Sequence, residues 1–433
     1  MASEARPPKT NVIATLRERG LISQITESGL EEQANRERLT VYCGFDPSRP
    51  SLQIGNVVPM ILLAHFQRAG HRSVVVVGGG TGMIGDPSFK SDERQMLTAE
   101  QVAHNAERVR QQLSGYLDFE GENPAIMVNN LDWLGKMTLI EYLRDIGKHF
   151  TINHMMAKES VKSRIESREH GISYAEFSYM ILQAADYLHL FDALDCTVQV
   201  GGNDQWGNLT AGVELIRKTR EARVHALTAP LITSPSGAKL GKTESGALFL
   251  DPAMTTPYEM YQYWINTDDR DVGLYLRVFT FIPLDEIAAL ERQQAEQPSS
   301  RVAQRRLAWE ITRLVHGQAV ADGVAAASNA LFGAGLGSLT EASLPYLAQA
   351  VPTSEIAASA LAEGLSPLDA LVQVGMQPSK GAARRLIQQG GLYVNDERWS
   401  DPERAITRDQ ALFGRALLLR AGKNRYHLLL VEE

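Results

Sequence analysis

Residues 41–56 read VYCGFDPSRPSLQIGN, and residues 239–243 read KLGKT. The first stretch begins as an apolar strand pattern, passes through a proline-containing turn and ends where a helix pattern starts. A helix N-terminus presents unpaired N–H groups and the positive end of the helix dipole, so this order favours a phosphate site. The second stretch brings two lysines on a glycine-containing loop. Together they predict a nucleotide-handling fold.

Strand and helix patterns alternate outward from these stretches. Short apolar runs that predict strands lie at residues 39–45, 73–77, 125–130 and 225–233, and residues 196–208 predict a strand that leads into a helix. Helical patterns separate them and dominate residues 136–191. This alternation predicts an α/β domain with a mostly parallel sheet. After residue 256 the pattern becomes helical through about residue 332.

The bulk composition is that of an ordinary globular protein. The chain has 433 residues, 44% of them hydrophobic and 22% charged, which allows two or three domains. No apolar run approaches the roughly 20 residues needed to span a bilayer, and no secretory signal is expected at the N-terminus. Cys43 and Cys196 are too few for a disulfide framework or a cysteine-rich zinc site. A reducing cytoplasm is the expected location.

One glycine motif invites a different interpretation. Residues 80–85 read GTGMIG, which fits the dinucleotide fingerprint GxGxxG and follows a strand pattern. That fingerprint also requires a second strand ending in an acidic residue about 20 residues further on. The sequence there continues as DPSFKSDERQ and then as a charged helix pattern. A nicotinamide or flavin site is therefore not favoured.

The motifs taken in order resemble the tyrosyl-tRNA synthetase family of class I aminoacyl-tRNA synthetases. Gln53-Ile54-Gly55-Asn56 stands where that family usually has His-Ile-Gly-His, and KLGKT resembles its Lys-Met-Ser-Lys-Ser loop. Amide groups can donate hydrogen bonds without carrying charge, so QIGN is expected to work. The alternative for QIGN is an ordinary helix start, and KLGKT taken alone would be a solvated turn.

The resemblance implies roles for residues at the ATP end of the site. Pyrophosphate departure needs positioning and electrostatic stabilisation rather than proton transfer. The residues expected to supply these are Gln53, Asn56, Lys90, Arg94, Lys239, Lys242 and Thr243. The remaining ATP-binding positions implied by the resemblance are Gly44, Asp46, Gly55, Gly202 and Asp204, with Lys242 also among them and Asp204 on the ribose.

A second set of residues is expected to bind the amino-acid substrate. Tyr179, Gln183 and Asp186 are spaced by four and three, which puts them on one helix face. An aspartate among apolar residues is costly unless it is paired, although Asp186 alone would more often be a surface acid. By resemblance, Tyr42 and Asp186 hold the tyrosine hydroxyl. Asp86, Tyr179 and Gln183 reach the α-ammonium group, and Gln205 lies near the amino acid.

The C-terminal segment carries a local excess of positive charge. Residues 380–425 contain ten Lys or Arg and five Asp or Glu, although the whole chain has a net charge of −8. A mixed, solvated surface is an equally good account of charge alone. The run QPSKGAARRLIQQGGLYVND at 377–396 resembles an S4 RNA-binding module, in which Lys380, Arg384 and Arg385 share a helix face.

The resemblance spans nearly the whole chain and implies four segments. They are a Rossmann-like catalytic domain at 1–232, a loop and helical domain at 233–332, a linker at 333–350 and an S4-like domain at 351–433. The last is expected to have helices first and short strands after. The implied activity is tyrosine–tRNA ligation by a homodimer, with tRNA(Tyr), L-tyrosine and ATP as partners, Mg²⁺ entering with ATP, and no tightly bound cofactor or dedicated metal site. The alternative is an inactive or back-up paralogue that binds RNA.

Overall fold

A computed structural model of the whole chain divides into two compact units. The first comprises residues 1–255 and 267–307, and the second comprises residues 256–266 and 308–433. The structure describes residues 10–26, 29–88, 97–158, 161–162, 165, 171–233, 240–243, 246–333 and 335–432, with Lys242 and Thr243 described by their backbone. The division into four segments stays a prediction.

The first unit is built on a six-stranded sheet in the order β1-β6-β5-β2-β3-β4. All neighbouring pairs are parallel except β1 with β6. The strands are β1 (Gln24–Ile25), β2 (Thr40–Phe45), β3 (Arg72–Val77), β4 (Ile126–Asn129), β5 (Cys196–Gly202) and β6 (His225–Ala229). The predicted α/β class and mostly parallel sheet are confirmed.

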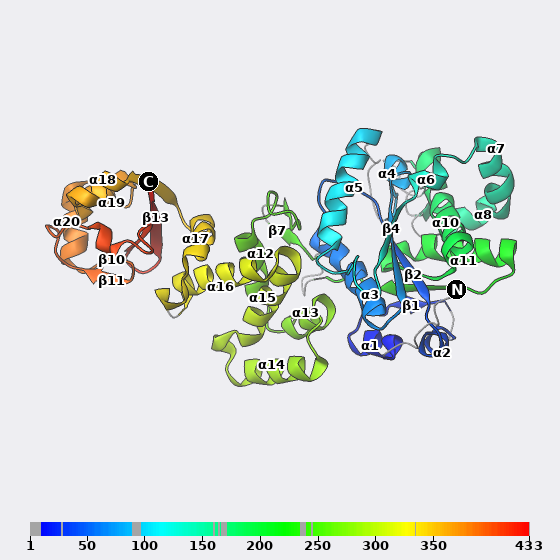
Figure 1. Cartoon of the computed structure of the whole chain (residues 1–433), viewed down its shortest axis with the longest axis horizontal. Helices are drawn as coiled ribbons and strands as arrows, with labels where there is room; N and C mark the ends of the chain where they lie inside the picture. Colours follow the sequence, from blue (N-terminus) through cyan, green and yellow to red (C-terminus); the bar gives the residue numbers. More distant parts are fainter. Residues whose placement is uncertain are drawn as a thin grey trace. The chain divides into compact units, whose positions relative to one another are not determined.

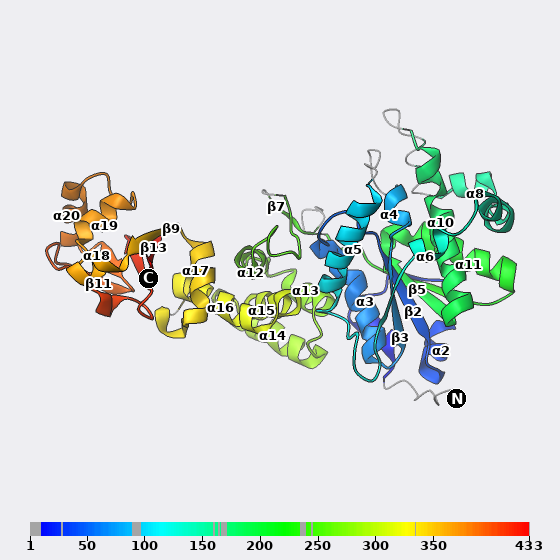
Figure 2. The ribbon, with the colours of Figure 1, turned by 45° about the horizontal axis from the view of Figure 1, so that its top comes forward.

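Helices cover both faces of this sheet (Figures 1 and 2). Helices α3 (Val57–Arg68) and α5 (Ala99–Leu113) lie on one side, and α10 (Tyr174–Leu194) and α11 (Trp206–Arg220) on the other. One hydrophobic core contains Tyr42 of β2, Val74 and Val76 of β3, and buried residues of α10 and α11. Val74 and Val76 share a face of the sheet because alternate residues of a strand point to the same side. The sheet is therefore buried on both faces, which explains its continuous apolar strands.

The remaining helices of the first unit are short or follow the sheet. They are α1 (Val12–Glu18), α2 (Leu30–Arg36), α4 (Thr81–Ile84), α6 (Leu131–Leu134), α7 (Leu139–Glu141), α8 (Ile152–Met156), α13 (Val272–Phe279) and α14 (Leu284–Glu296). Helix α15 (Val302–His316) contributes residues to both units. A two-stranded hairpin, β7 (Lys242–Thr243) with β8 (Gly246–Ala247), carries the end of the KLGKT stretch.

The second unit has its own sheet and its own core. The strands β9 (Thr353–Ala357), β10 (Leu392–Val394), β11 (Glu397–Trp399), β12 (Ala416–Ala421) and β13 (Arg425–Glu432) are ordered β11-β10-β12-β13-β9. Its helices are α12 (Pro257–Ile265), α16 (Gln318–Phe332), α17 (Leu344–Ala350), α18 (Ala358–Glu363), α19 (Pro367–Gln373) and α20 (Lys380–Gln388). Residues 356–431 contribute a hydrophobic cluster of their own.

Two details of this unit differ from the sequence-based expectation. The strand β9 precedes the helices and pairs in parallel with β13, so the C-terminal segment does not begin with a helix. Only Ile356 of β9 is buried, which left no clear alternating pattern to detect. The predicted linker contains α17, and Leu344 and Leu347 are buried. Apolar residues spaced within a Gly- and Ser-rich stretch were enough to fold it.

Candidate active site

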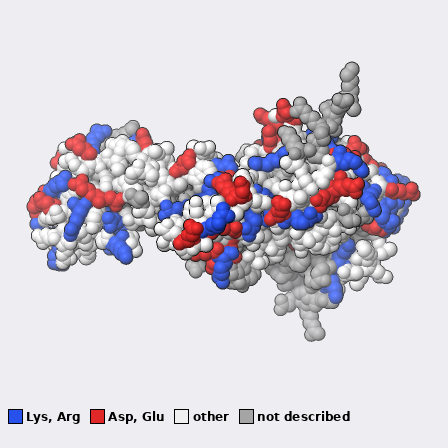
Figure 3. Space-filling view, turned by 90° about the horizontal axis from the view of Figure 1, so that it is seen from below, with Lys and Arg blue, Asp and Glu red and all other residues white. Residues whose placement is uncertain are grey.

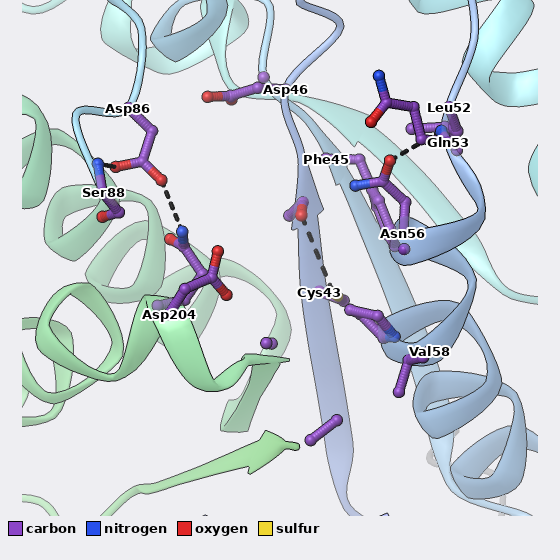
Figure 4. A pocket seen from close by; sticks show the side chains of 18 of the residues that line it. Cys43, Phe45, Asp46, Leu52, Gln53, Asn56, Val58, Asp86, Ser88 and Asp204 are labelled. Atoms are coloured by element: carbon purple, nitrogen blue, oxygen red, sulfur yellow. Dashed lines mark hydrogen bonds between the residues drawn. The ribbon is translucent and has the colours of Figure 1, made fainter. Parts of the chain in front are cut away.

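A cavity of about 610 Å³ opens at the carboxyl ends of β2 and β5. The chain leaves β2 toward β3 on one side and leaves β5 toward β6 on the other, so these adjacent strands form a topological switch point. Open α/β sheets bind ligands at this point because the connecting loops diverge there. Residues from the ends of both strands, from the start of α3 and from α10 line the cavity (Figure 4).

The QIGN stretch forms the turn at the N-terminus of α3 (the α3 entrance), at one end of this cavity. The Gln53 N–H donates to Asn56 Oδ1 at 2.9 Å, and the Asn56 N–H donates to Gln53 O at 2.8 Å. Since Asn56 Oδ1 already accepts a hydrogen bond, its Nδ2 is the group left to donate outward (Figure 4). Gln53 and Asn56 both line the cavity. The site thus presents uncharged donors at a helix N-terminus.

The segment after the KLGKT hairpin is held directly against QIGN. Ile54 N–H donates to Leu248 O at 3.0 Å, and Gln53 forms an isolated β-bridge with Phe249. Gly241 has φ +81°, and a Cβ built there would lie 2.3 Å from Ile54 Cγ2. Only glycine allows both this backbone conformation and this close approach. The two signature stretches are therefore neighbours in space.

Helix α5 holds the residues just before QIGN and the segment that follows the KLGKT hairpin. Gln112 accepts the Leu52 N–H at 2.9 Å and donates to Ser51 Oγ at 3.2 Å. The Asp251 N–H also donates to Ser51 Oγ, at 3.0 Å, and the Asp251 carboxylate pairs with Arg108 of α5. Sequence reasoning missed these contacts, because polar residues on an amphipathic helix pattern give no signal of a specific partner.

Asp186 occupies the deep end of the cavity. It is 3% exposed and accepts hydrogen bonds from Asn130 Nδ2 at 2.9 Å and Trp133 Nε1 at 2.7 Å. Burial raises the pKa of the Asp186 carboxyl to about 7, and the two donors oppose part of that rise. Asn130 and Trp133 were not predicted as site residues. Asn130 stands directly after β4, at the edge where polar residues of a parallel sheet gather, and that position was an available signal.

Tyr42, on β2, provides a second polar group beside Asp186. Its side chain is 1% exposed, and its hydroxyl has no hydrogen-bond partner among the described residues. Burial raises the pKa of Tyr42 well above its usual value, and the nearby Asp186 charge raises it further. The hydroxyl therefore keeps its proton. A buried orphan hydroxyl is costly, and such groups mark places where a ligand group would complete the hydrogen bonding.

The other residues predicted to bind the amino-acid substrate line the same cavity. Tyr179 and Gln183 line it from α10, as their spacing with Asp186 predicted. The Tyr179 hydroxyl donates to Asp46 Oδ2 at 2.6 Å, while Gln205 Nε2 donates to Asp86 Oδ2 at 2.6 Å. These pairs link Asp46, which follows β2, to α10, and Asp86, which follows α4, to the turn before α11. Figure 4 shows Asp86 and Asp204 on the opposite side of the cavity from Gln53 and Asn56.

Some predicted residues lie outside what the structure describes. Lys90, Arg94 and Lys239 are outside the described residues, and the side chains of Lys242 and Thr243 are too. Gly44, Gly55, Gly202 and Asp204 all line the cavity. Among the described residues, no group of three or more His, Cys, Asp or Glu could hold a metal ion, and no helix is long and apolar enough to cross a membrane.

The predicted RNA-binding residues stand on α20 of the second unit. Lys380 pairs with Asp369, and Arg384 pairs with Glu403 at 2.5 Å, whereas Arg385 is exposed. Ser379 caps the helix by accepting the Ala382 N–H at 3.2 Å. Figure 3 shows Lys and Arg interspersed with Asp and Glu over this unit. The basic excess is thus partly neutralised by surface ion pairs, which are weak and easily exchanged.

Two family models cover most of the chain. Residues 34–333 match the model described as tRNA synthetases class I (W and Y), and residues 345–429 match the model described as the tyrosine–tRNA ligase SYY-like C-terminal domain. Together they match the first half of the chain, the helical region and the C-terminal segment.

Similar proteins match from 75% to 97% of the chain. The chain is 48% identical to the tyrosine–tRNA ligase of Roseiflexus castenholzii over 97% of this chain and 99% of that protein. It is 49% identical to the tyrosine–tRNA ligase of Geobacillus stearothermophilus over the same shares. Among solved structures, a C-terminally truncated mitochondrial tyrosyl-tRNA synthetase from Aspergillus nidulans superposes with a TM-score of 0.67 at 32% identity, covering 75% of this chain and 94% of that one.

Proposed function

Because the chain belongs to the class I tRNA synthetases, in the tyrosine–tRNA ligase family, we propose that the switch-point cavity activates L-tyrosine with ATP. The tyrosine carboxylate attacks the α-phosphate of ATP, the bond from that phosphorus to the bridging oxygen breaks, and pyrophosphate leaves. The tyrosyl group then passes from AMP to the 3′ end of tRNA(Tyr). ATP is a substrate here, and Mg²⁺ enters with its phosphates because that ion keeps several waters and needs few protein ligands.

The observation that carries this assignment is the buried pair of Tyr42 and Asp186. A phenol hydroxyl is both a donor and an acceptor, and this pair offers a carboxylate to accept and a protonated hydroxyl without a partner. Asn130 and Trp133 hold the carboxylate in place from the far side. An amino acid without the hydroxyl would leave these buried groups unpaired, so the site would reject it.

The α-amino group of the substrate is assigned to Asp86, which follows α4 and lies on the opposite side of the cavity from Gln53 and Asn56. Asp86 is held by Gln205 and by the Ser88 N–H at 3.0 Å. Tyr179 and Gln183 complete this group from α10. The ribose is assigned to Asp204, which lines the cavity next to Gln205. These roles follow the resemblance of the sequence motifs and the position of each residue on the cavity wall.

The triphosphate is assigned to the entrance of α3. Asn56 Nδ2 and Gln53 donate without charge, and the helix N-terminus adds a positive potential. The contact between Gly241 and Ile54 brings the KLGKT stretch to this end of the cavity. Lys239 and Lys242, with Thr243, Lys90 and Arg94, are proposed to surround the departing pyrophosphate.

Binding of tRNA(Tyr) is assigned to the C-terminal segment. Lys380, Arg384 and Arg385 are proposed to contact the RNA backbone, since phosphates can replace the surface carboxylates that now pair two of them. A cytoplasmic location belongs to the same proposal. It is supported by Cys43 and Cys196, which are both buried and unpaired by disulfide.

We infer a homodimer from an apolar face on the first unit. Large hydrophobic side chains that stand exposed gather within residues 131–174: Leu131, Leu139, Ile140, Leu143, Ile152, Met156, Ile165 and Tyr174. Leu139, Ile140 and Tyr174 are 68%, 66% and 72% exposed. Large exposed apolar patches mark interaction surfaces, and a second copy of this chain is the partner proposed here.

Tyrosine-dependent exchange of pyrophosphate into ATP tests the proposed function. Full-length protein with Mg²⁺ should exchange with tyrosine and much less with phenylalanine. An inactive RNA-binding paralogue would show no exchange while still binding tRNA(Tyr). That outcome would refute the enzyme assignment. A back-up copy would behave as the enzyme in this assay.

A further inference from the structure

We propose that Arg49 binds the β- and γ-phosphates of ATP and stabilises the departing pyrophosphate. This inference rests on the proposed function and adds a residue to its phosphate end. Arg49 stands in the turn between β2 and the QIGN stretch and lines the cavity together with Ser48, Gln53 and Asn56. It was not among the residues that the sequence motifs singled out.

The charge balance of the cavity is the first argument. Among the described residues that line it, four are carboxylates, and Arg49 is the sole cation. The carboxylates are Asp46, Asp86, Asp186 and Asp204. A triphosphate is repelled by such a wall unless positive charge stands where it lies. The amides of Gln53 and Asn56 donate hydrogen bonds but bring no charge.

The free state of the guanidinium is the second argument. Arg49 is exposed and makes no ion pair or hydrogen bond with any residue in the described part of the chain. Two other exposed arginines of the first unit are engaged, since Arg217 pairs with Glu214 and Arg270 pairs with Asp268. Arginine presents a planar fork of donors that matches two phosphate oxygens at once. No described residue therefore occupies the donors of Arg49, which leaves them to a ligand in this part of the structure.

The fixed backbone on both sides of Arg49 is a third observation in favour of this role. Asn105 of α5 donates to Pro47 O at 2.9 Å, and Gln112 of the same helix holds Ser51 and the Leu52 N–H. Pro47 and Pro50 restrict the backbone of the turn further. Binding then orders one side chain rather than a loop, which lowers the entropic cost of placing the charge.

The position of the charge agrees with where charge develops in the reaction. When the α-phosphorus bond to the bridging oxygen breaks, negative charge builds on that oxygen and on the β- and γ-phosphates. The turn that carries Arg49 leads directly into the α3 entrance, where these phosphates are assigned. Arg49 thus supplies the charge that the two amides of QIGN lack.

The test compares Arg49→Gln with a matched control, Arg292→Gln. Arg292 is exposed on α14, does not line the cavity, and its loss changes net charge equally. We expect Arg49→Gln to lower kcat/KM for ATP in pyrophosphate exchange by roughly 10- to 100-fold, less than a fully desolvated arginine because the residue is exposed. The control should stay at the wild-type value. Arg49→Lys should recover part of the loss, since it keeps the charge without the fork.

Two further measurements make the outcome decisive. Calorimetric binding of α,β-methylene ATP reads the phosphate contact without catalysis, so it tests Arg49 even if exchange by the wild type fails. Weaker binding by Arg49→Gln supports the proposal, provided that the thermal unfolding midpoint matches the wild type. Adding Gln53→His should reduce the loss caused by Arg49→Gln, because a second cation then reaches the same phosphates.

Three results would overturn the proposal. One is equal ATP-analogue affinity and equal exchange in Arg49→Gln and Arg292→Gln. Another is a loss confined to tRNA charging, which would assign Arg49 to the acceptor end of the RNA. The third is strict additivity of the Gln53→His and Arg49→Gln effects, which would place the two side chains on separate groups.

Discussion

Replacing Tyr42 by Phe should move two properties of the protein in opposite directions. The Tyr42 ring packs against Tyr187, with centroids 5.2 Å apart, and lies in the core shared with α10 and α11. Phenylalanine keeps this packing and removes a buried hydroxyl that has no partner among the described residues. An unsatisfied buried polar group costs about 1–3 kcal/mol, so the ligand-free variant should be more stable by about 1 kcal/mol.

The same substitution should weaken the preference for tyrosine. The substrate hydroxyl loses one neutral partner, worth about 0.5–1.5 kcal/mol, while Asp186 remains. Discrimination against phenylalanine should therefore fall by roughly 2- to 12-fold, since 1.4 kcal/mol corresponds to a factor of ten. Pyrophosphate exchange with both amino acids, together with thermal unfolding of the ligand-free protein, measures the two effects. A less stable variant with unchanged discrimination would refute this account of the phenol pocket.

Three other predictions address the carboxylate, the tail and the apolar face. The pKa of Asp186 is raised from 3.8 to about 7, so the folded protein holds a proton there that the unfolded chain releases. This contribution to stability is full below about pH 4 and is lost as the pH rises through 7. Relative to Asp186→Asn, the wild type should thus lose on the order of 4 kcal/mol of unfolding free energy between pH 4 and 8. Tyrosine KM should fall over pH 6–8 in the wild type alone, and parallel pH profiles of the two proteins would contradict this. Removal of residues from about 350 onward should leave exchange intact and abolish salt-sensitive tRNA charging, because residues 356–431 have their own core; undiminished charging would refute the RNA assignment. Leu139→Asp with Ile140→Asp should halve the mass measured by light scattering at micromolar concentration, and an unchanged mass would exclude this face as the interface.

The sheet was predictable from the sequence because its strands are buried on both faces. A strand covered by helices on each side reads as a continuous apolar run, as Val74 to Val77 do, and such runs stand out against the intervening helices. The C-terminal sheet was harder for the same physical reason. β9 lies at an edge with one buried residue, so its sequence gives little periodicity.

Some of the site residues were likewise predictable from the sequence and others were not. Residues on one regular element could be grouped from spacing alone, as with Tyr179, Gln183 and Asp186 on α10. Contacts between distant elements could not, because periodicity says which face a residue shares but not what that face meets. Asn130 and Gln112 act on residues 56 and 60 positions away in the chain. Arg49 was missed because an arginine in a turn is ordinarily just a solvated charge.

Single-turnover formation of tyrosyl-adenylate by the full-length wild type is the most direct test of the central claim. The purified protein would be mixed with Mg²⁺, ATP and excess tyrosine, and released pyrophosphate and enzyme-bound adenylate would be counted per site. The account predicts one pyrophosphate and one bound tyrosyl-adenylate for each competent site, although positions 53 and 56 carry uncharged amides. Folded protein that binds both tyrosine and ATP but forms no adenylate would contradict it.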